Sequence, residues 1–150
     1  MATRTPINYL NNTLATNIVT AALTVNGQTS QQQIIETLNI KSTSAGTVAH
    51  DFSSGAIWYH SSMTGNFTCA LTNVPTTQNK TAVVSLFLNQ GATPFYSSTL
   101  TVNGSAVAIR WPNSALPVPT ANKIDLETIT LMNIGGTFSA FGQYTSMGTA

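Results

Sequence analysis

Short β-prone runs separated by turn residues constrain this chain more than any other feature. Residues 66–72 alternate cleanly, with Phe67, Cys69 and Leu71 on one side and polar or small residues on the other. A period of two residues is that of a strand with one buried face. The sequence has no convincing helical stripe, heptad or tandem repeat. It therefore predicts an all-β chain.

Turn residues mark the ends of the runs. Asn103-Gly104 separates residues 98–102 from residues 105–111, which predicts a hairpin with a two-residue type I′ turn because both central residues tolerate positive φ. Gly135-Gly136 predicts a second hairpin, between residues 124–134 and 137–145. The other expected strands cover residues 18–25, 34–40, 47–52, 56–60, 66–72 and 81–89.

Eight to ten short strands at this spacing are typical of two architectures. We expect an antiparallel β-sandwich or a Greek-key, jelly-roll-like barrel. Residues 81–89 are almost continuously apolar, which predicts a strand covered on both faces, at a sheet centre or under a subunit contact. Residues 1–17 show no period and are predicted to be an extended N-terminal arm, with a frayed terminus as the alternative, which leaves residues 18–150 as a single β domain.

Charged residues make up only 6% of the chain, and the formal net charge is +1. A nucleic-acid-binding protein needs clustered cations to neutralise phosphates, whereas the five Lys and Arg residues here are scattered. Thr, Ser, Asn and Gln supply 60 of the 150 residues, so polarity comes without charge repulsion between copies. The composition therefore disfavours nucleic-acid binding and favours assembly with other subunits that cover strand edges and apolar patches.

The uninterrupted apolar runs are only a few residues long, far below the ~20 residues needed to span a bilayer. No apolar segment follows Arg4 near the N-terminus, which is unlike a secretory signal. We expect a soluble chain with no membrane insertion and no secretory signal.

Few residues offer the chemistry of an enzyme. His50 and Asp51 are adjacent, so their side chains point to opposite faces of a strand and cannot form a dyad. A Cys69–His60 pair would need neighbouring strands in register, and a buried, inert thiol is the commoner role of a lone cysteine. No single pair provides both an activated group and an orienting partner.

The two carboxylates Asp125 and Glu127 are two residues apart and share one face of a strand. This spacing suits a general acid and base, yet we expect them on a solvated or intersubunit face because no histidine or phosphate-binding loop is near in sequence. His50 and His60 could approach across the turn at residues 53–55, but two imidazoles are a poor ligand set for zinc. One histidine per subunit around a trimer axis is the alternative metal site. We expect no catalytic residue, metal site or cofactor.

Exposed Trp and Tyr can stack on sugars. Trp58 and Tyr59 are adjacent, so one is expected in the core and the other outward. Trp111 precedes Pro112 at a strand end, beside a proline-rich loop. Packing in the core or in an interface is the favoured role of these rings, and glycan contact is the alternative.

Several segments, in order, resemble a known family. They are His50-Asp51-Phe52-Ser53-Ser54-Gly55, Trp58-Tyr59-His60-Ser61-Ser62, Asn66-Phe67-Thr68, Asn73-Val74-Pro75-Thr76-Thr77, Ile109-Arg110-Trp111 and Asn122-Lys123-Ile124-Asp125. Over about residues 45–145 the chain resembles a small β-rich domain of virion structural proteins of tailed bacteriophages, especially phages of cyanobacteria and other marine hosts. This family usually has a Gly-containing turn where this chain has Pro112-Asn113. The resemblance implies a non-enzymatic component of the particle, on a fibre, a tail or a capsid surface.

The size of the chain favours one of these locations. A fibre shaft needs length, repeats or a coiled coil, whereas 150 residues with an N-terminal arm suit a capsid decoration (cement) protein. We expect a homotrimer in the virion, assembled in the host cytoplasm, that contacts the major capsid protein or other virion proteins. The alternatives are a short tail fibre or receptor-binding tip that contacts host surface glycan, and a polysaccharide hydrolase that lacks a credible acid–base pair. The residues expected at interfaces are Ile7, Tyr9, Leu10, Trp58, Tyr59, Phe87 and Trp111.

Overall fold

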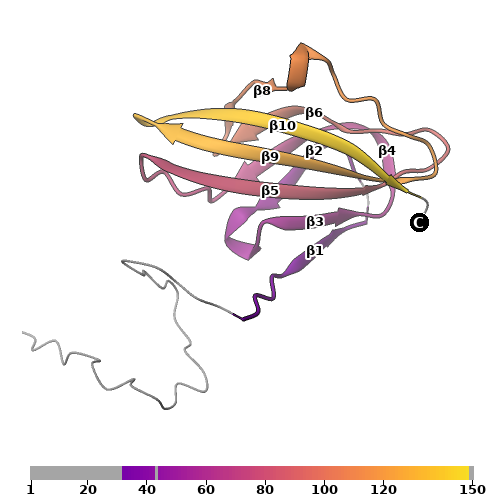
Figure 1. The fold of residues 1–150 in the computed structure, drawn as a ribbon, viewed down its shortest axis with the longest axis horizontal. Helices are drawn as coiled ribbons and strands as arrows, with labels where there is room; N and C mark the ends of the chain where they lie inside the picture. Colours follow the sequence, from indigo (N-terminus) through magenta and orange to yellow (C-terminus); the bar gives the residue numbers. More distant parts are fainter. Residues whose placement is uncertain (1–31, 43, 149–150) are drawn as a thin grey trace, which may run out of the picture. The chain divides into compact units, whose positions relative to one another are not determined.

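The computed structural model describes residues 32–42 and 44–148, and strands make up nearly all of its regular structure (Figure 1). The chain divides after Ile34, and the unit from Ile35 onward contains every strand described below. The predicted arm, its boundary at residue 17 and the predicted strand at 18–25 lie outside the described residues. The prediction of an all-β chain is confirmed for the described part.

Ten strands and two short 3₁₀ helices follow one another along the chain. They are β1 (Leu38–Lys41), β2 (Ser44–Asp51), η1 (Phe52–Ser54), β3 (Ile57–His60), β4 (Met63–Thr72), β5 (Lys80–Asn89), β6 (Ser97–Val102), β7 (Ser105–Ala106), β8 (Ile109–Arg110), η2 (Pro112–Ser114), β9 (Ile124–Ile134) and β10 (Thr137–Gly148). No helix among them is long and apolar enough to cross a membrane.

The strands form two open sheets, with the orders β1-β3-β5-β9-β10-β8 and β2-β4-β6-β7. Through β6 the chain alternates between the sheets, and each strand pairs in parallel with the strand two earlier. The first six strands are therefore three successive turns of a flattened coil. The β9–β10 hairpin then pairs antiparallel with β5, and β8 adds in parallel to β10.

Two parts of the predicted architecture are wrong. Five of the eight strand pairings are parallel, so the expected antiparallel arrangement does not hold. Within the described strands neither sheet closes on itself, so there is no barrel. The physical reason is that the turn at Phe52–Ser54 carries the chain from one sheet to the other, where a hairpin would have kept it in the same sheet.

Both predicted hairpin turns are confirmed. Val102 pairs with Ser105, and Asn103 and Gly104 adopt φ values of 49° and 84°, as a type I′ turn requires. Ile134 pairs with Thr137 across the Gly135-Gly136 turn. The expected long strand at 105–111 is instead two short strands, β7 and β8, which belong to different sheets.

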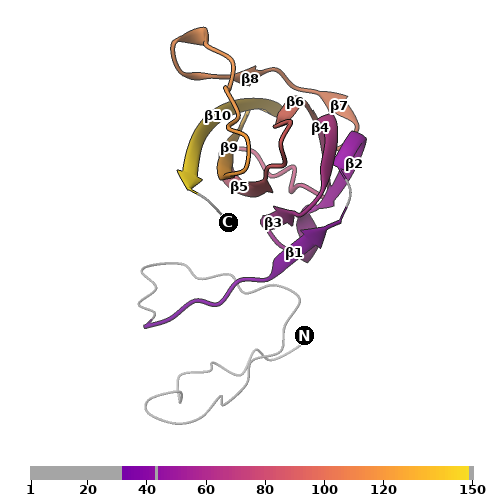
Figure 2. The same ribbon diagram turned by 90° about the vertical axis from the view of Figure 1, so that its right-hand side faces the viewer.

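One core lies between the sheets, with β2 and β4 on one side of the interior and β9 and β10 on the other (Figure 2). The four-stranded sheet contributes Phe67, Cys69 and Leu71, as the alternation at 66–72 predicts. From the six-stranded sheet, Leu86 and Ile129 are both completely buried. The inner faces of the two sheets thus share a single apolar interior.

Candidate functional site

Four buried side chains form a polar relay across the interior. The Ser44 Oγ lies 2.6 Å from His60 Nδ1, and His60 Nε2 lies 3.2 Å from His50 Nε2. The relay ends at Cys69, whose Sγ is 3.5 Å from His50 Nδ1. All four residues are completely buried, because β2 and β4 of one sheet place them opposite β3 of the other.

Burial keeps both imidazoles neutral. Desolvation lowers the pKa of His50 to about 3, helped by the neighbouring His60 and Lys41. Desolvation, with a smaller contribution from Lys41, lowers the pKa of His60 to about 4. In a neutral imidazole one ring nitrogen donates and the other accepts. The contacts with Ser44, Cys69 and the other imidazole thus give every ring nitrogen of His50 and His60 a polar neighbour.

The Cys69 thiol contacts His50. It does not pair with His60, which was the partner in the candidate Cys69–His60 pair. Burial, and secondarily the charge of Glu127, raises the pKa of the Cys69 thiol far above its usual value. A nucleophilic cysteine needs the opposite shift together with access to solvent. The arrangement is therefore a buried hydrogen-bonded network and not a nucleophile with its base.

The two carboxylates share one face of β9, as predicted, but the expected solvated or intersubunit position is wrong. Both Asp125 and Glu127 are completely buried, because the inner face of β9 includes them in the same row as Ile129 and Leu131. Strand alternation identifies which residues share a face, but it does not identify which face is buried when the row mixes charged and apolar residues.

Each buried carboxylate has its own set of donors. Glu127 accepts hydrogen bonds from the backbone N–H of Ser97, at 3.1 Å, and from the Ser97 hydroxyl. The Oδ2 of Asp125 accepts from Tyr144 at 2.8 Å, from the Gln90 amide at 3.1 Å and from the backbone N–H of Thr120 at 3.1 Å. These bonds hold β9 to the loops and strands around it.

Burial raises the pKa of two acidic side chains in this network, Glu127 and Tyr144. Desolvation raises the pKa of Glu127 to about 7, although its hydrogen bonds with Ser97 oppose the shift. Desolvation also raises the pKa of Tyr144, and the hydrogen bond to Asp125 adds to it. A carboxylic acid with a pKa near neutrality suits general acid catalysis only where a substrate can reach it, and Glu127 has no exposed surface.

His50 and Asp51 point to opposite sides, as predicted from their adjacency. Asp51 is exposed, and its Oδ1 accepts from the backbone N–H and hydroxyl of Ser53 and from the Asn73 amide. The side-chain hydrogen bonds with Ser53 and Asn73 lower the pKa of Asp51. Its role is to cap η1. In the part of the chain that the structure describes, no three His, Cys, Asp or Glu residues are grouped as metal ligands.

The outer face of the six-stranded sheet is the most unusual surface of the described molecule. The strand register places four apolar side chains side by side across four strands: Ile40, Tyr59, Phe87 and Leu126. We call these four residues the apolar row. Ile40 is 60% exposed, and the other three are half-buried. Val83 and Phe141 add exposed apolar area on the same face, at 48% and 41%.

This outer face is also nearly free of charge. Among the strand positions that point outward from the six-stranded sheet, only Arg110 is charged, and its guanidinium lies over the Phe141 ring, 5.5 Å from the centroid. The polar residues between the apolar ones include Ser85, Thr128 and Gln143. Among the described residues no layer covers this face, and an apolar sheet face flanked by uncharged polar residues is typical of an interaction surface.

Trp111 is packed against the backbone of β10. A Cβ added at Gly142 would lie 2.7 Å from Ile109 Cγ2 and closer still to the six-membered ring of Trp111. The glycine is therefore needed for space, since the indole occupies the volume of any larger side chain. Trp111 remains partly exposed and lines a cleft of about 340 Å³ with Arg110 and Phe141.

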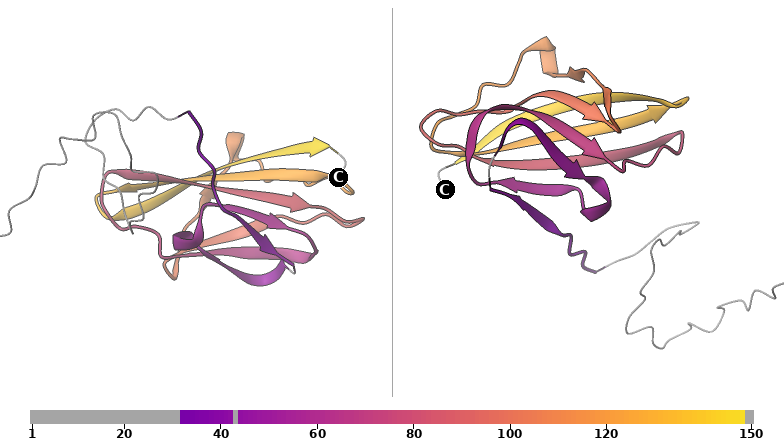
Figure 3. Two further views of the ribbon diagram at one scale, coloured as in Figure 1. Left: turned by 90° about the horizontal axis from the view of Figure 1, so that it is seen from below. Right: turned by 180° about the vertical axis from the view of Figure 1, so that it is seen from behind.

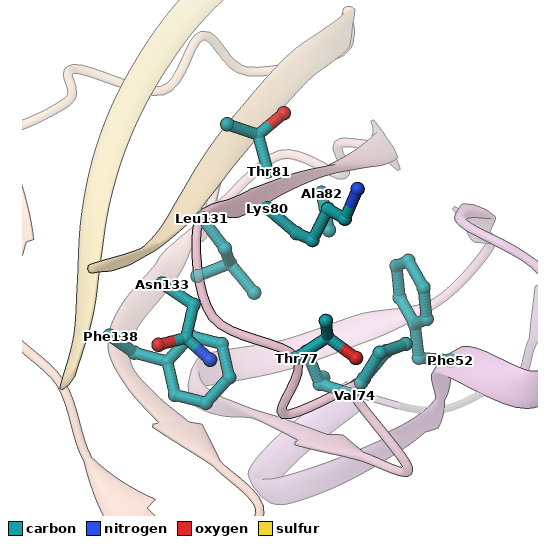
Figure 4. A pocket seen from close by; sticks show the side chains of 10 residues that line it. Phe52, Val74, Thr77, Lys80, Thr81, Ala82, Leu131, Asn133 and Phe138 are labelled. Carbon is teal, nitrogen blue, oxygen red and sulfur yellow. The ribbon is translucent and has the colours of Figure 1, made fainter. Parts of the chain in front are cut away.

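A second cleft, of about 300 Å³, opens at the end of the sheets where β5 begins (Figure 4). Its lining is mainly apolar, with Phe52, Leu131 and Phe138 around it and Lys80 beside it. Asn133 also lines it and donates from its amide to the carbonyl oxygen of Thr76. The lining holds no histidine, cysteine or carboxylate, so it provides no acid–base pair.

The residues predicted at interfaces differ in where they lie in the structure. Trp58 is 1% exposed, so its prediction as an interface residue is wrong: the ring fills the core and packs edge-on against His50. Tyr59 points outward, which confirms the predicted split of the Trp58-Tyr59 pair, and it lies beside Phe87 in register. Ile7, Tyr9 and Leu10 lie outside the described residues.

Sequence reasoning missed two members of the apolar row, Ile40 and Leu126. The alternation of β9 was the available signal, since Leu126 falls between two residues of the buried face. Comparison with known proteins adds no family, because no family model, curated protein or solved structure matches the chain.

Proposed function

We propose that this protein is a non-enzymatic structural subunit of a tailed-phage particle, a capsid decoration protein that acts as a homotrimer. The observation that carries the proposal is the nearly uncharged, apolar outer face of the six-stranded sheet, which holds the apolar row. The two sheets act as the layers of a sandwich in which only one face of this sheet is covered by the core.

The burial of the titratable side chains in the core also supports a structural role. His50, His60, Cys69, Asp125 and Glu127 are completely buried, and four of them have shifts in pKa that favour the neutral form. Groups of this kind hold the interior together through hydrogen bonds. They are not placed where a substrate would meet them.

The size of the face fits a subunit contact. Six strands spaced about 4.8 Å apart, with about seven residues of 3.3 Å each, give a face of about 670 Å². Side-chain relief increases this area toward the ~800 Å² that each partner buries in a standard interface. Three copies that turn this face toward a common axis would each shield the apolar row of the other two.

A decoration subunit stabilises a shell by mass action. Because it binds the assembled lattice and not the free shell protein, each bound copy makes disassembly less favourable. In this proposal the predicted arm, with Ile7, Tyr9 and Leu10, contacts neighbouring virion proteins. Deletion of residues 1–17 tests the arm: unchanged occupancy on purified capsids would refute its role.

The central test combines localisation with a charge placed on the face. Electron microscopy of particles with labelled protein should place it on the capsid surface. Phe87→Lys should abolish trimers and capsid occupancy, whereas Thr72→Lys, at an exposed position of the other sheet, should leave both unchanged. Equal behaviour of the two variants would contradict the assignment of this face.

One observation favours a second candidate function, a receptor-binding tip or short tail fibre. The cleft beside Trp111 combines that indole and the exposed Phe141 with the polar side chains of Arg110 and Gln143. Aromatic surface next to hydrogen-bonding groups is what a glycan site requires. Binding of labelled protein to host cells, and not to capsids, would favour this function.

A further inference from the structure

The strand β1 is an edge of the six-stranded sheet and pairs only with β3 among the described strands (Figure 3, right, where β1 is at the lower boundary of the sheet). The carbonyl of Lys41 accepts a hydrogen bond from Ser61 N–H at 3.0 Å, so Lys41 directs its backbone toward β3. Backbone groups of successive strand residues point to alternate sides. Leu38 and Ile40 therefore direct their N–H and C=O groups to the open edge.

The other three edge strands carry devices that limit further pairing, whereas β1 has four residues in unbroken register and no proline. β7 and β8 have only two residues each, and Pro112 follows β8 closely. The strand β2 has a register irregularity between Ser44 and Gly46. Short strands, proline and bulges are the devices that protect sheet edges from further pairing.

The side chains at the β1 edge are apolar as well. Leu38 is 53% exposed and Ile40 is 60% exposed. Both are on the outer face of the sheet, where Ile40 begins the apolar row. An exposed edge with free backbone groups and apolar side chains is a template for strand addition.

We propose that β1 pairs in antiparallel orientation with β1 of a second copy, about a twofold axis that passes between the two Asn39 residues. In this register Leu38 lies opposite Ile40 of the other copy, so the apolar side chains form two cross-strand pairs on the same face. Lys41 lies opposite Thr37, which keeps the two lysines apart. The two sheets become one continuous sheet, and the apolar rows of the two copies lie on its same face.

The inference goes beyond the proposed function and does not depend on a location on the particle. A twofold contact doubles the mass of the species that carries it, whether a monomer becomes a dimer or a trimer becomes a hexamer. It is thus distinct from the threefold contact proposed for the outer face.

A disulfide trap in the full-length chain tests the register. Asn39 would lie opposite its own copy in a non-hydrogen-bonded pair, with Cα atoms about 4.5 Å apart, within the range a disulfide spans. The natural chain has one cysteine, Cys69, which is fully buried and gives little background. Under mild oxidation, Asn39→Cys should form a linked dimer about tenfold faster than Ser105→Cys, because pairing raises the local concentration of the two thiols.

Two comparisons make the trap decisive. Ser105 is an exposed position on the edge strand β7, so it reports random collision between edges. Ile40→Cys should also link more slowly than Asn39→Cys, because residue 40 faces residue 38 of the other copy. Linking of Asn39→Cys at the rate of Ser105→Cys would overturn the proposal.

Asn39 donates hydrogen bonds to the carbonyls of Ser54 and Ile57, so Asn39→Cys could fail to fold. A second variant tests the proposal without changing Asn39. Ile40→Lys puts a charge on the open edge. It should raise the dissociation constant of the mass-doubling step about tenfold in sedimentation equilibrium, because two cross-strand pairs are lost. An unchanged constant, or the absence of any mass doubling in the natural chain, would overturn the proposal. Loss of trimers in Phe87→Lys with mass doubling intact would leave it standing.

Discussion

The buried Glu127 makes a specific prediction about stability and pH. Its carboxyl is in the core, and desolvation raises its pKa from 4.5 to about 7 in the folded protein. A folded-state pKa above the unfolded value means that the folded protein binds this proton more tightly. The contribution of Glu127 to stability is therefore fully present below pH 4.5 and is lost as the pH rises through 7.

The magnitude follows from the shift. Each pKa unit is worth 1.36 kcal/mol, so a rise from 4.5 to about 7 corresponds to about 3 kcal/mol of unfolding free energy lost once the carboxyl is fully ionised. For a domain of this size, a change of that order lowers the melting temperature by about 10 °C or more. Glu127→Gln removes the titration while keeping an oxygen that can accept from the Ser97 N–H.

The assay is urea unfolding at fixed protein concentration in steps from pH 5 to pH 8. Because His50 and His60 contribute stability that rises with pH up to 6.5, the Glu127 term is read as the difference between the two chains: from pH 5 to pH 8 the natural chain should lose most of the ~3 kcal/mol relative to Glu127→Gln. Glu36→Gln, which changes an exposed glutamate, should reproduce the natural profile. If the natural chain and Glu127→Gln have parallel profiles, burial does not control the protonation of Glu127, and the reasoning fails.

Three further predictions concern other buried positions. Gly142→Ala should destabilise the fold by about 1–3 kcal/mol, because the added Cβ overlaps the Trp111 ring, and the change should alter tryptophan fluorescence. On the acid side, the pKa values of His50 and His60 lie below 6.5, so their contribution is present above pH 6.5 and is lost as the pH falls toward 4; His60→Phe should reduce the slope of unfolding free energy against pH in that window. The Cys69 thiol should react with a water-soluble thiol reagent only as fast as the protein unfolds, because it is fully buried and its pKa is raised.

Local sequence patterns predicted the local structure well. The alternation at 66–72 identified the buried face of β4, and the Asn103-Gly104 pair identified a hairpin with the correct turn. The adjacency of Trp58 and Tyr59 predicted that they would separate, although it could not say which one enters the core. These features depend on residues a few positions apart, where strand and turn geometry are decisive.

Features that depend on distant residues could not be predicted in the same way. The parallel pairing of β3 with β5 joins segments separated by β4 and a loop, and no local pattern encodes its direction. The burial of Glu127 depends on Ser97, thirty residues away, which supplies its hydrogen bonds. Without that partner, an isolated carboxylate in the core would be strongly unfavourable, and a surface position is the better expectation.

The two faces of strand β5 differ in what they contribute to the fold and to the proposed assembly. Its inner residues Val84, Leu86 and Leu88 are completely buried, while Val83 and Phe87 face outward in the same strand. In a strand with only one buried face, apolar residues alternate with polar ones. Residues 81–89 therefore contain more apolar side chains than the core alone requires. The excess lies on the face that carries the apolar row and that continues to the open edge at β1. Because the described interior is already filled from the inner faces of the two sheets, these outward side chains are free for the contacts between copies that we propose.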